Sequence, residues 1–266
     1  MRPILDLRGQ FWLGHEPPSE RDIRKLSERF PTLDAAEDER RIRTEVLARS
    51  DGKVNQELAQ LLMCAAPREP SSVGCDPLVT REFQIWFVDR GLEIHEQQPG
   101  KPKAYTFLDV GDAVETGKLG TLDWRKEQLR LRRRLERNLG PNVVVIGVGE
   151  VEADEERGIW QPHHHVMIYG AGKDSLETLR QKHYHAERTG PRPMKRSKID
   201  SPAVWFSYMS KLTAFGKLVE RSNGLDGPPM RTRLSPKMSR EYFRYISRIL
   251  PTSLVFSMNC QIVKGS

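Results

Sequence analysis

The spacing of hydrophobic and polar positions changes near residue 100, from helical periods to a mixture of strand and helix periods. Two proline-containing stretches, Pro67–Ser72 and Glu96–Lys103, break the apolar pattern before that point. The segments before these breaks predict helices over Ser19–Phe30, Asp34–Ala48 and Val54–Cys64. We therefore expect a mainly helical N-terminal segment, residues 1–100, whose role no pattern indicates, and a second unit, residues 101–266.

The second unit alternates between β-branched runs, which predict strands, and amphipathic segments, which predict helices. Strands are expected over 104–110, 142–152, 159–169 and 254–258, and helices over 123–139, 174–185, 202–219 and 239–249. A basic stretch, Thr189–Lys198, is expected as a loop. This order predicts an α+β fold, with an antiparallel-containing central sheet and helices on its faces.

The balance of charged residues indicates which class of molecule the protein binds. Lys and Arg number 43 against 36 Asp and Glu, a net charge of +7, which favours a polyanion such as nucleic acid or an acidic membrane surface. The three cysteines form no CxxC pair, which indicates a reducing compartment. The N-terminus lacks the continuous apolar run of a signal peptide, and other apolar runs are too short to span a bilayer, so we expect a cytoplasmic protein without a membrane partner.

Three of the seven histidines lie together in the predicted strand 159–169, directly after Pro162. Residues two apart on a strand share a face, so His163 and His165 project together while His164 points to the other side. Two such imidazoles, about 7 Å apart at the backbone, can bind one divalent cation. A second HxH, His183–His185, falls at the end of a predicted helix, where residues two apart diverge.

A third ligand is expected from the preceding strand, where Glu150 and Glu152 share a face. A register that pairs Glu150 with His163 would bring its carboxylate to the histidines, whereas a slip of one residue would send both glutamates to the wrong side. We favour Glu150 and keep Glu152 as the alternative. A chance cluster of surface histidines remains a second interpretation.

A candidate nucleophile follows on the predicted helix 202–219. Tyr208 and Lys211 are three apart and therefore share a helix face. A nearby ammonium favours the phenolate, which is a competent nucleophile toward phosphorus. Alternatively, Tyr208 packs among its apolar neighbours. Tyr242 and Tyr245 form a rival pair, ranked lower because no lysine follows at the matching position and they lie further along the chain from the histidines.

Three short motifs in this order resemble those of the HUH endonucleases, and in particular of rolling-circle replication initiator (Rep) proteins of plasmids and small phages: Gly147–Glu152, Gln161–Ile168 and Tyr208–Lys211. The likeness covers roughly residues 104–219. His164 departs from the usual bulky apolar residue between the two histidines, and Leu212 stands where some initiators have a second tyrosine. The resemblance therefore implies a single-tyrosine enzyme of the HUH nuclease, ferredoxin-like type.

The resemblance also implies a mechanism. His163, His165 and an acidic partner, Glu150, would hold Mg²⁺ or Mn²⁺ against the scissile phosphate of single-stranded DNA. Tyr208 would attack in line, forming a 5′-phosphotyrosine and releasing a 3′-hydroxyl that primes DNA synthesis. Lys211 would hold the phosphate or help to ionise Tyr208. The expected activity is site-specific nicking and strand transfer that initiates rolling-circle replication.

The expected partners are single-stranded origin DNA, a host polymerase and a host helicase, since the chain has no Walker-type GxxxxGK[ST] segment of its own. Basic residues after the histidine strand offer a track for the DNA backbone: Lys195, Arg196, Lys198, Arg231, Arg233 and Lys237. The basic run Arg130–Arg137 is as readily explained as a solvated helix face. Three other functions stay open: a non-catalytic origin- or repressor-type DNA-binding protein, a single-tyrosine HUH transposase, and a zinc-dependent hydrolase of a small substrate.

Overall fold

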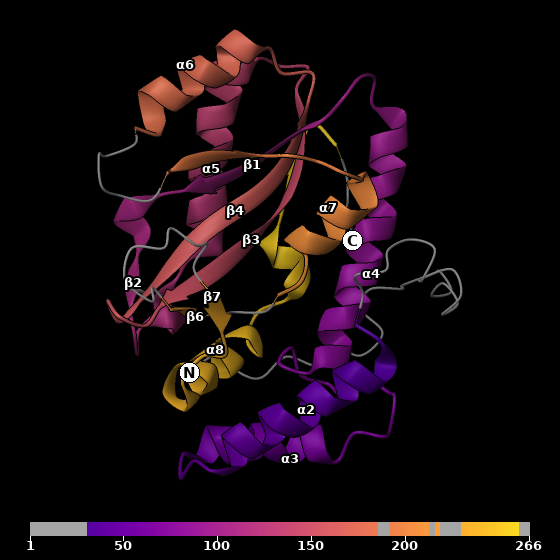
Figure 1. Ribbon diagram of the computed structural model, residues 1–266, viewed down its shortest axis with the longest axis vertical. Coiled ribbons are helices and arrows are strands. Elements are labelled where there is room, and N and C mark those ends of the chain that lie inside the picture. The colour runs from indigo at the N-terminus through magenta and orange to yellow at the C-terminus, as the bar shows by residue number, and fades with distance from the viewer. Residues whose placement is uncertain (1–30, 186–191, 213–215, 219–229, 261–266) are drawn as a thin grey trace.

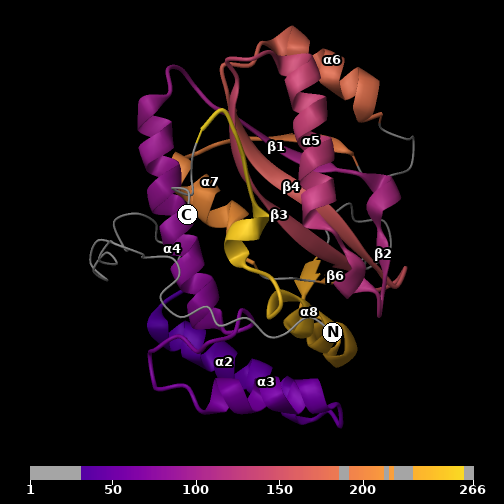
Figure 2. The same cartoon turned by 180° about the vertical axis from the view of Figure 1, so that it is seen from behind.

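An eight-stranded sheet forms the centre of the molecule, and helices lie on both of its sides (Figures 1 and 2). The computed structural model describes residues 31–185, 192–212, 216–218 and 230–260, so the predicted helix Ser19–Phe30 lies outside the described residues. The described helices are α2 (Leu33–Ala48), α3 (Lys53–Met63), α4 (Pro77–Gln97), α5 (Trp124–Leu139), α6 (Lys173–His183), α7 (Pro202–Met209) and α8 (Pro236–Ile246). The strands are β1 (Lys103–Leu108), β2 (Val114–Glu115), β3 (Val144–Asp154), β4 (Ile159–Tyr169), β5 (Met194–Ser197), β6 (Gly216–Leu218), β7 (Met230–Thr232) and β8 (Val255–Met258). The predicted α+β class is confirmed.

The long antiparallel hairpin of β3 and β4 is the middle of the sheet, whose main path runs β5-β1-β4-β3-β6-β7. Additional pairing joins β2 to β4 and β8 to β3. The hairpin turn contains Gly158 at a φ of 63°, a left-handed conformation that glycine adopts without strain. Asp154 closes the same turn, since its Oδ1 accepts a hydrogen bond from the backbone N–H of Arg157 at 2.9 Å. These interactions fix the register on which the site depends.

Alternate residues of the strands belong to two separate hydrophobic clusters, one on each face of the sheet. Val145 and Ile168 point to the face covered by α5 and α6. Ile146 and Met167 point to the other face, which α4 and α7 cover (Figures 1 and 2). Because His163 and His165 have the parity of Met167, the backbone alternation puts them on the face covered by α4 and α7.

The N-terminal helices share a core with the sheet rather than forming one of their own. One hydrophobic cluster includes residues from α2, α3, α4, α7, α8 and the central strands. Helix α4, which lies along α7, carries Phe87, whose ring centroid is 5.9 Å from that of Phe206. Gln84 donates a hydrogen bond to the carbonyl oxygen of Ser207 at 2.7 Å. A side chain at Gly91 would bring a Cβ within 2.8 Å of the Phe206 ring, so the close approach of the two helices requires glycine.

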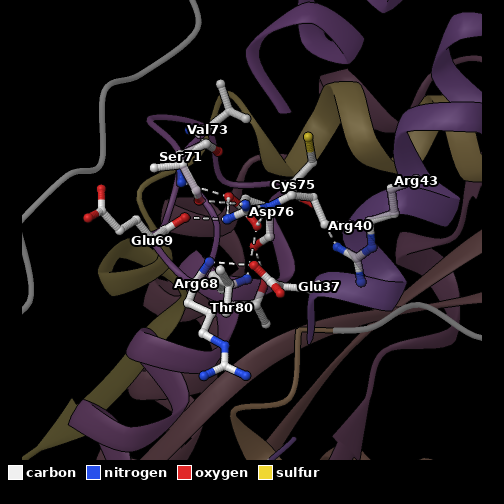
Figure 3. A network of polar contacts seen from close by, with 12 residues as sticks. Glu37, Arg40, Arg43, Arg68, Glu69, Ser71, Val73, Cys75, Asp76 and Thr80 are labelled. Carbon is white, nitrogen blue, oxygen red and sulfur yellow. Dashed lines mark hydrogen bonds and ion pairs between the residues drawn. The ribbon is translucent and has the colours of Figure 1, made fainter. Parts of the chain in front are cut away.

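A buried ion pair ties α2 to the start of α4 (Figure 3). Arg40 donates from Nε and Nη2 to the two carboxylate oxygens of Asp76 at 3.1 and 2.9 Å, and both side chains are shielded from solvent. Asp76 also accepts from the backbone N–H groups of Ser71 and Leu78, the second being the N-cap bond of α4. Arg40 further donates to the backbone oxygens of Ala66 and Glu69. This network fixes the connection between α3 and α4.

Two sequence predictions about the part of the chain after α6 are wrong. The helix expected over 202–219 ends at Met209, and a strand, β6, occupies Gly216–Leu218. The basic stretch expected as a loop contains β5, which pairs antiparallel with β1. Helix α4 was not predicted at all. Within the described residues, we find no helix that combines the length and apolar character needed to cross a bilayer.

Candidate active site

Three buried side chains from the β3–β4 hairpin converge on one point. Glu150 lies directly opposite His163 in the hairpin register, which is the register that the favoured choice of Glu150 required. Glu150 Oε2 is 3.5 Å from His163 Nε2 and 3.2 Å from His165 Nε2. The two histidine Nε2 atoms are 3.1 Å apart. Among the described residues, this is the one group of three His, Cys, Asp or Glu side chains whose ligand atoms lie close enough together, within 4.8 Å, to bind a metal ion.

The other nitrogen of each imidazole has a partner that orients the ring. His165 Nδ1 is 2.9 Å from Thr106 Oγ1, on the neighbouring strand β1, where Thr106 lies opposite His165. His163 Nδ1 is 3.3 Å from the backbone oxygen of Gln161. When Nδ1 carries the proton and donates to these oxygens, the Nε2 lone pair is directed at the point shared with Glu150. This is the tautomer that a metal-binding histidine needs.

The charges of the group suit cation binding at neutral pH. Burial by itself would raise the pKa of Glu150, but the Lys211 ammonium and hydrogen bonds from the two histidines outweigh it and hold the pKa well below its usual range. Burial lowers the pKa of His165 to about 4, against the opposing hydrogen bond with Glu150. The carboxylate is therefore ionised and the His165 imidazole neutral, the protonation states that coordinate metal ions.

The middle histidine belongs to the other face of the sheet. His164 lies edge-on to Trp124 of α5, with ring centroids 5.3 Å apart. Burial is the main cause that lowers its pKa to about 3, and its Nε2 has no hydrogen-bond partner within the described part of the chain. Gly149, opposite His164, allows the Trp124 ring to lie against β3, because a Cβ there would be 2.5 Å from the ring. The sequence expectation that His164 points away from the other two is thus met.

Tyr208 and Lys211 reach the same point from α7 and the turn that follows it. The Tyr208 ring centroid is 5.0 Å from that of His165 and 5.2 Å from that of Trp205, on which it stacks. Lys211 Nζ lies 4.1 Å from the Tyr208 ring centroid and 3.6 Å from Glu150 Oε1. Because α7 ends at Met209, the two residues do not meet as neighbours on a helix face; the chain beyond the helix brings the ammonium over the ring.

The hydroxyl groups of the rival tyrosines, Tyr242 and Tyr245, form hydrogen bonds with residues other than Glu150, His163 and His165. Tyr242 is buried and donates from its hydroxyl to the carbonyl oxygen of Leu212 at 2.8 Å. Tyr245 is buried and accepts from Trp124 Nε1. Burial raises the pKa of both tyrosines well above the usual value, which disfavours the phenolate. Glu152, the alternative ligand, is half-buried opposite Gln161 and is not a member of the ligand group.

The basic residues proposed as a DNA track are distributed over several elements. Lys195 and Arg196 are exposed on β5, Lys198 pairs with Asp200 at 3.1 Å, and Lys237 is exposed on α8. Arg233 pairs with Glu39 at 2.9 Å, and the Arg231 side chain lies outside the described residues. In the run 130–137, three arginines, Arg130, Arg132 and Arg134, pair with acidic side chains that follow β1 or belong to α5, which supports its interpretation as a helix face.

Sequence reasoning missed Thr106 and Trp205 as parts of the site. Thr106 contacts His165 only because β1 pairs with β4, and no local spacing encodes that pairing. Comparison of the chain with models of protein families, with curated proteins and with solved structures gave no match in any of the three.

Proposed function

We propose that this protein is a metal-dependent endonuclease that nicks single-stranded DNA through a phosphotyrosine intermediate and so starts rolling-circle replication. The observation that carries the proposal is the meeting of Tyr208 and Lys211 with the Glu150, His163 and His165 group at one point. A tyrosine packed on a histidine of a two-histidine, one-carboxylate group has both parts that phosphoryl transfer to a tyrosine needs.

The donor set fits a divalent cation, with Glu150, His163 and His165 as its ligands. Two imidazoles and one carboxylate suit Mn²⁺ better than Mg²⁺, which prefers oxygen ligands. Such an ion, when bound, supplies polarisation of the phosphoryl oxygens and offsets the charge that develops on them. The pKa of Glu150 is held low and burial lowers that of His165 to about 4, so at neutral pH this carboxylate is ionised and this imidazole is neutral, as a cation requires.

The reacting groups of the chain are Tyr208 and Lys211. The Tyr208 hydroxyl oxygen forms a bond to phosphorus while the bond from phosphorus to the 3′-oxygen of the preceding nucleotide breaks. The phenolic proton passes to solvent, and the departing 3′-oxygen takes up a proton to become a hydroxyl. The Lys211 ammonium, close to both the Tyr208 ring and Glu150, attracts the phosphate to this point.

The test is covalent adduct formation with labelled single-stranded DNA. We expect a band of protein-linked DNA on a denaturing gel with Mn²⁺ and none with EDTA. Tyr208→Phe should abolish the band, whereas Tyr105→Phe, a tyrosine on the opposite face of the sheet, should leave it unchanged. An adduct that survives in Tyr208→Phe would refute the assignment of the nucleophile. Binding of DNA without an adduct under any condition would favour the non-catalytic DNA-binding function instead.

A further inference from the structure

A groove that Lys211 helps to line lies between the N-terminal helices and α8. Its volume is about 490 Å³. Its described walls come from α2, the first half of α4, residues Arg233 and Leu234 before α8, and α8 itself. A volume of this size is typical of a ligand pocket, which spans roughly 300–1,000 Å³. Figure 1 shows α2 and α8 lying beside the lower end of α4. The groove is therefore built jointly by the N-terminal segment and the sheet-containing unit.

Lys211 connects this groove to the candidate active site. The same side chain that lines the groove also lies 3.6 Å from Glu150 Oε1 and 4.1 Å from the Tyr208 ring centroid. A chain bound with one phosphate at Tyr208 would therefore have a neighbouring nucleotide beside the groove. This adjacency distinguishes the groove from a pocket elsewhere on the surface.

The lining combines an apolar wall with a positive charge excess. Ile42, Leu234 and Phe243 give the wall apolar and aromatic surface. Among the described lining residues, four side chains are cationic, Lys211, Arg43, Arg81 and Arg233, and Glu39 is the one carboxylate. Glu39 pairs with Arg43 at 3.1 Å and with Arg233 at 2.9 Å, so it offsets the two arginines only in part.

This combination fits an unpaired nucleotide chain. A base without a partner offers a flat apolar face for the aromatic and aliphatic wall, and the phosphates that flank it match the cationic side chains. A paired duplex hides its base faces and offers only phosphates to such a wall. The charge excess and the apolar wall together therefore favour single-stranded over double-stranded DNA.

We propose that the substrate strand continues from the phosphate at Tyr208 into this groove, so that α2 and α4 form one wall of the single-stranded DNA site. The inference rests on the proposed function for its substrate class. It assigns a role to the N-terminal helices, which lie outside the motifs that resemble known nucleases. The apolar wall holds a base, and Arg233 and Lys211 face the phosphates.

Binding can be measured separately from cleavage. A fluorescein-labelled single-stranded DNA pool of random sequence is titrated with the full chain in EDTA, and fluorescence anisotropy gives the dissociation constant. Ala35→Trp places a large side chain on the groove wall, whereas Ala48→Trp places it on an exposed position of the same helix outside the described lining. We expect Ala35→Trp to weaken binding by about tenfold, the effect of losing one base contact, and Ala48→Trp to bind as the wild type does.

A charge variant tests the phosphate contact independently. Arg233→Ala and Arg41→Ala each remove an arginine with similar side-chain exposure, 66% and 68%, and each arginine is paired with a carboxylate. Arg41 is outside the described groove lining. With Arg233→Ala, the slope of log affinity against log salt should become shallower by about 0.7, the value for one phosphate of a single strand. Arg41→Ala should keep the wild-type slope.

The outcomes separate this inference from the proposed function. Wild-type adduct formation with Mn²⁺, together with groove variants that bind as their controls do, would overturn the inference alone. Weakened binding in both groove variants supports the inference even when no adduct forms, a result that would overturn the nuclease proposal. Equal competition by duplex DNA, or no binding of single-stranded DNA at all, would also overturn the inference. Equal urea midpoints of Ala35→Trp and Ala48→Trp establish that folding is not the cause.

Discussion

Replacing Thr106 by valine should weaken metal binding while leaving the metal-free protein nearly unchanged. Valine keeps the shape of threonine and replaces the hydroxyl by a methyl group. Thr106 Oγ1 is 2.9 Å from His165 Nδ1, and the variant removes this partner. His165 is only 4% exposed, so water has little access to replace the lost hydrogen bond.

The magnitude follows from the tautomer that each state requires. Without metal, a neutral His165 in the variant can carry its proton on Nε2 and donate it to Glu150, 3.2 Å away. With metal on Nε2, the proton must lie on Nδ1, where the variant offers no acceptor. A buried unsatisfied donor costs about 1–3 kcal/mol. Affinity for Mn²⁺ should therefore fall by about 10–100-fold, the usual effect of losing a residue that orients a ligand.

Isothermal titration calorimetry with Mn²⁺, in the absence of DNA, measures this effect directly. Thr106→Ser is the matched control because it keeps the hydroxyl, and it should bind within about threefold of the wild type. An affinity of Thr106→Val within twofold of the wild type would refute the orienting role. Equal losses in both variants would show that the methyl group of Thr106, and not its hydroxyl, supports the site.

Three further predictions concern the framework of the site. Asp76→Ala leaves the buried Arg40 without its carboxylate, so the free energy of unfolding measured by urea titration should fall by ~3–5 kcal/mol. As a control, Asp34→Ala breaks an exposed pair and should change this free energy by less than ~1 kcal/mol. Gly147→Ala would put a Cβ 2.2 Å from a backbone oxygen of β4 and should lower the free energy of unfolding by ~1–3 kcal/mol. In the control Gly120→Ala, the new Cβ meets no described atom within 4 Å, so the free energy of unfolding should hardly change. The folded-state pKa of His164, about 3, is below its ordinary value, so the unfolded chain binds the extra proton and stability falls as pH drops from about 6.5 toward 4. The variant His164→Leu removes that contribution, and its urea midpoint should vary less over this pH range; an unchanged dependence would contradict the assignment.

The hairpin that carries the metal group could be predicted because its signals are local. Strand β4 has the boundaries that its pattern predicts, Ile159–Tyr169, and the alternation of its residues gave the face of each histidine. The choice of Glu150 over Glu152 depended on one structural fact, the register, which the hairpin fixes through its short turn. A pattern with period two specifies faces but not partners, so the register had to be assumed.

Helix α4 could not be predicted from periodicity because it is buried on nearly every side. Its apolar residues do not form one stripe, and polar residues such as Gln84 are buried beside them. The readable signal was its start, where Asp76 caps the helix and Pro77 occupies the first turn. The role of Thr106 was equally hidden, since it depends on pairing between strands separated by α5 and β3.

The predicted contact between Tyr208 and Lys211 is present, although the helix that was predicted to create it ends before Lys211. Tyr208 and Lys211 were expected to meet through helical spacing, yet the helix ends at Met209. The chain instead turns at Leu212, whose φ of 41° is uncommon for a residue with a branched side chain. Its carbonyl oxygen accepts the Tyr242 hydroxyl, 2.8 Å away, which holds the turn in place. Tyr242, considered from sequence as a rival nucleophile, is thus better understood as a residue that positions Lys211.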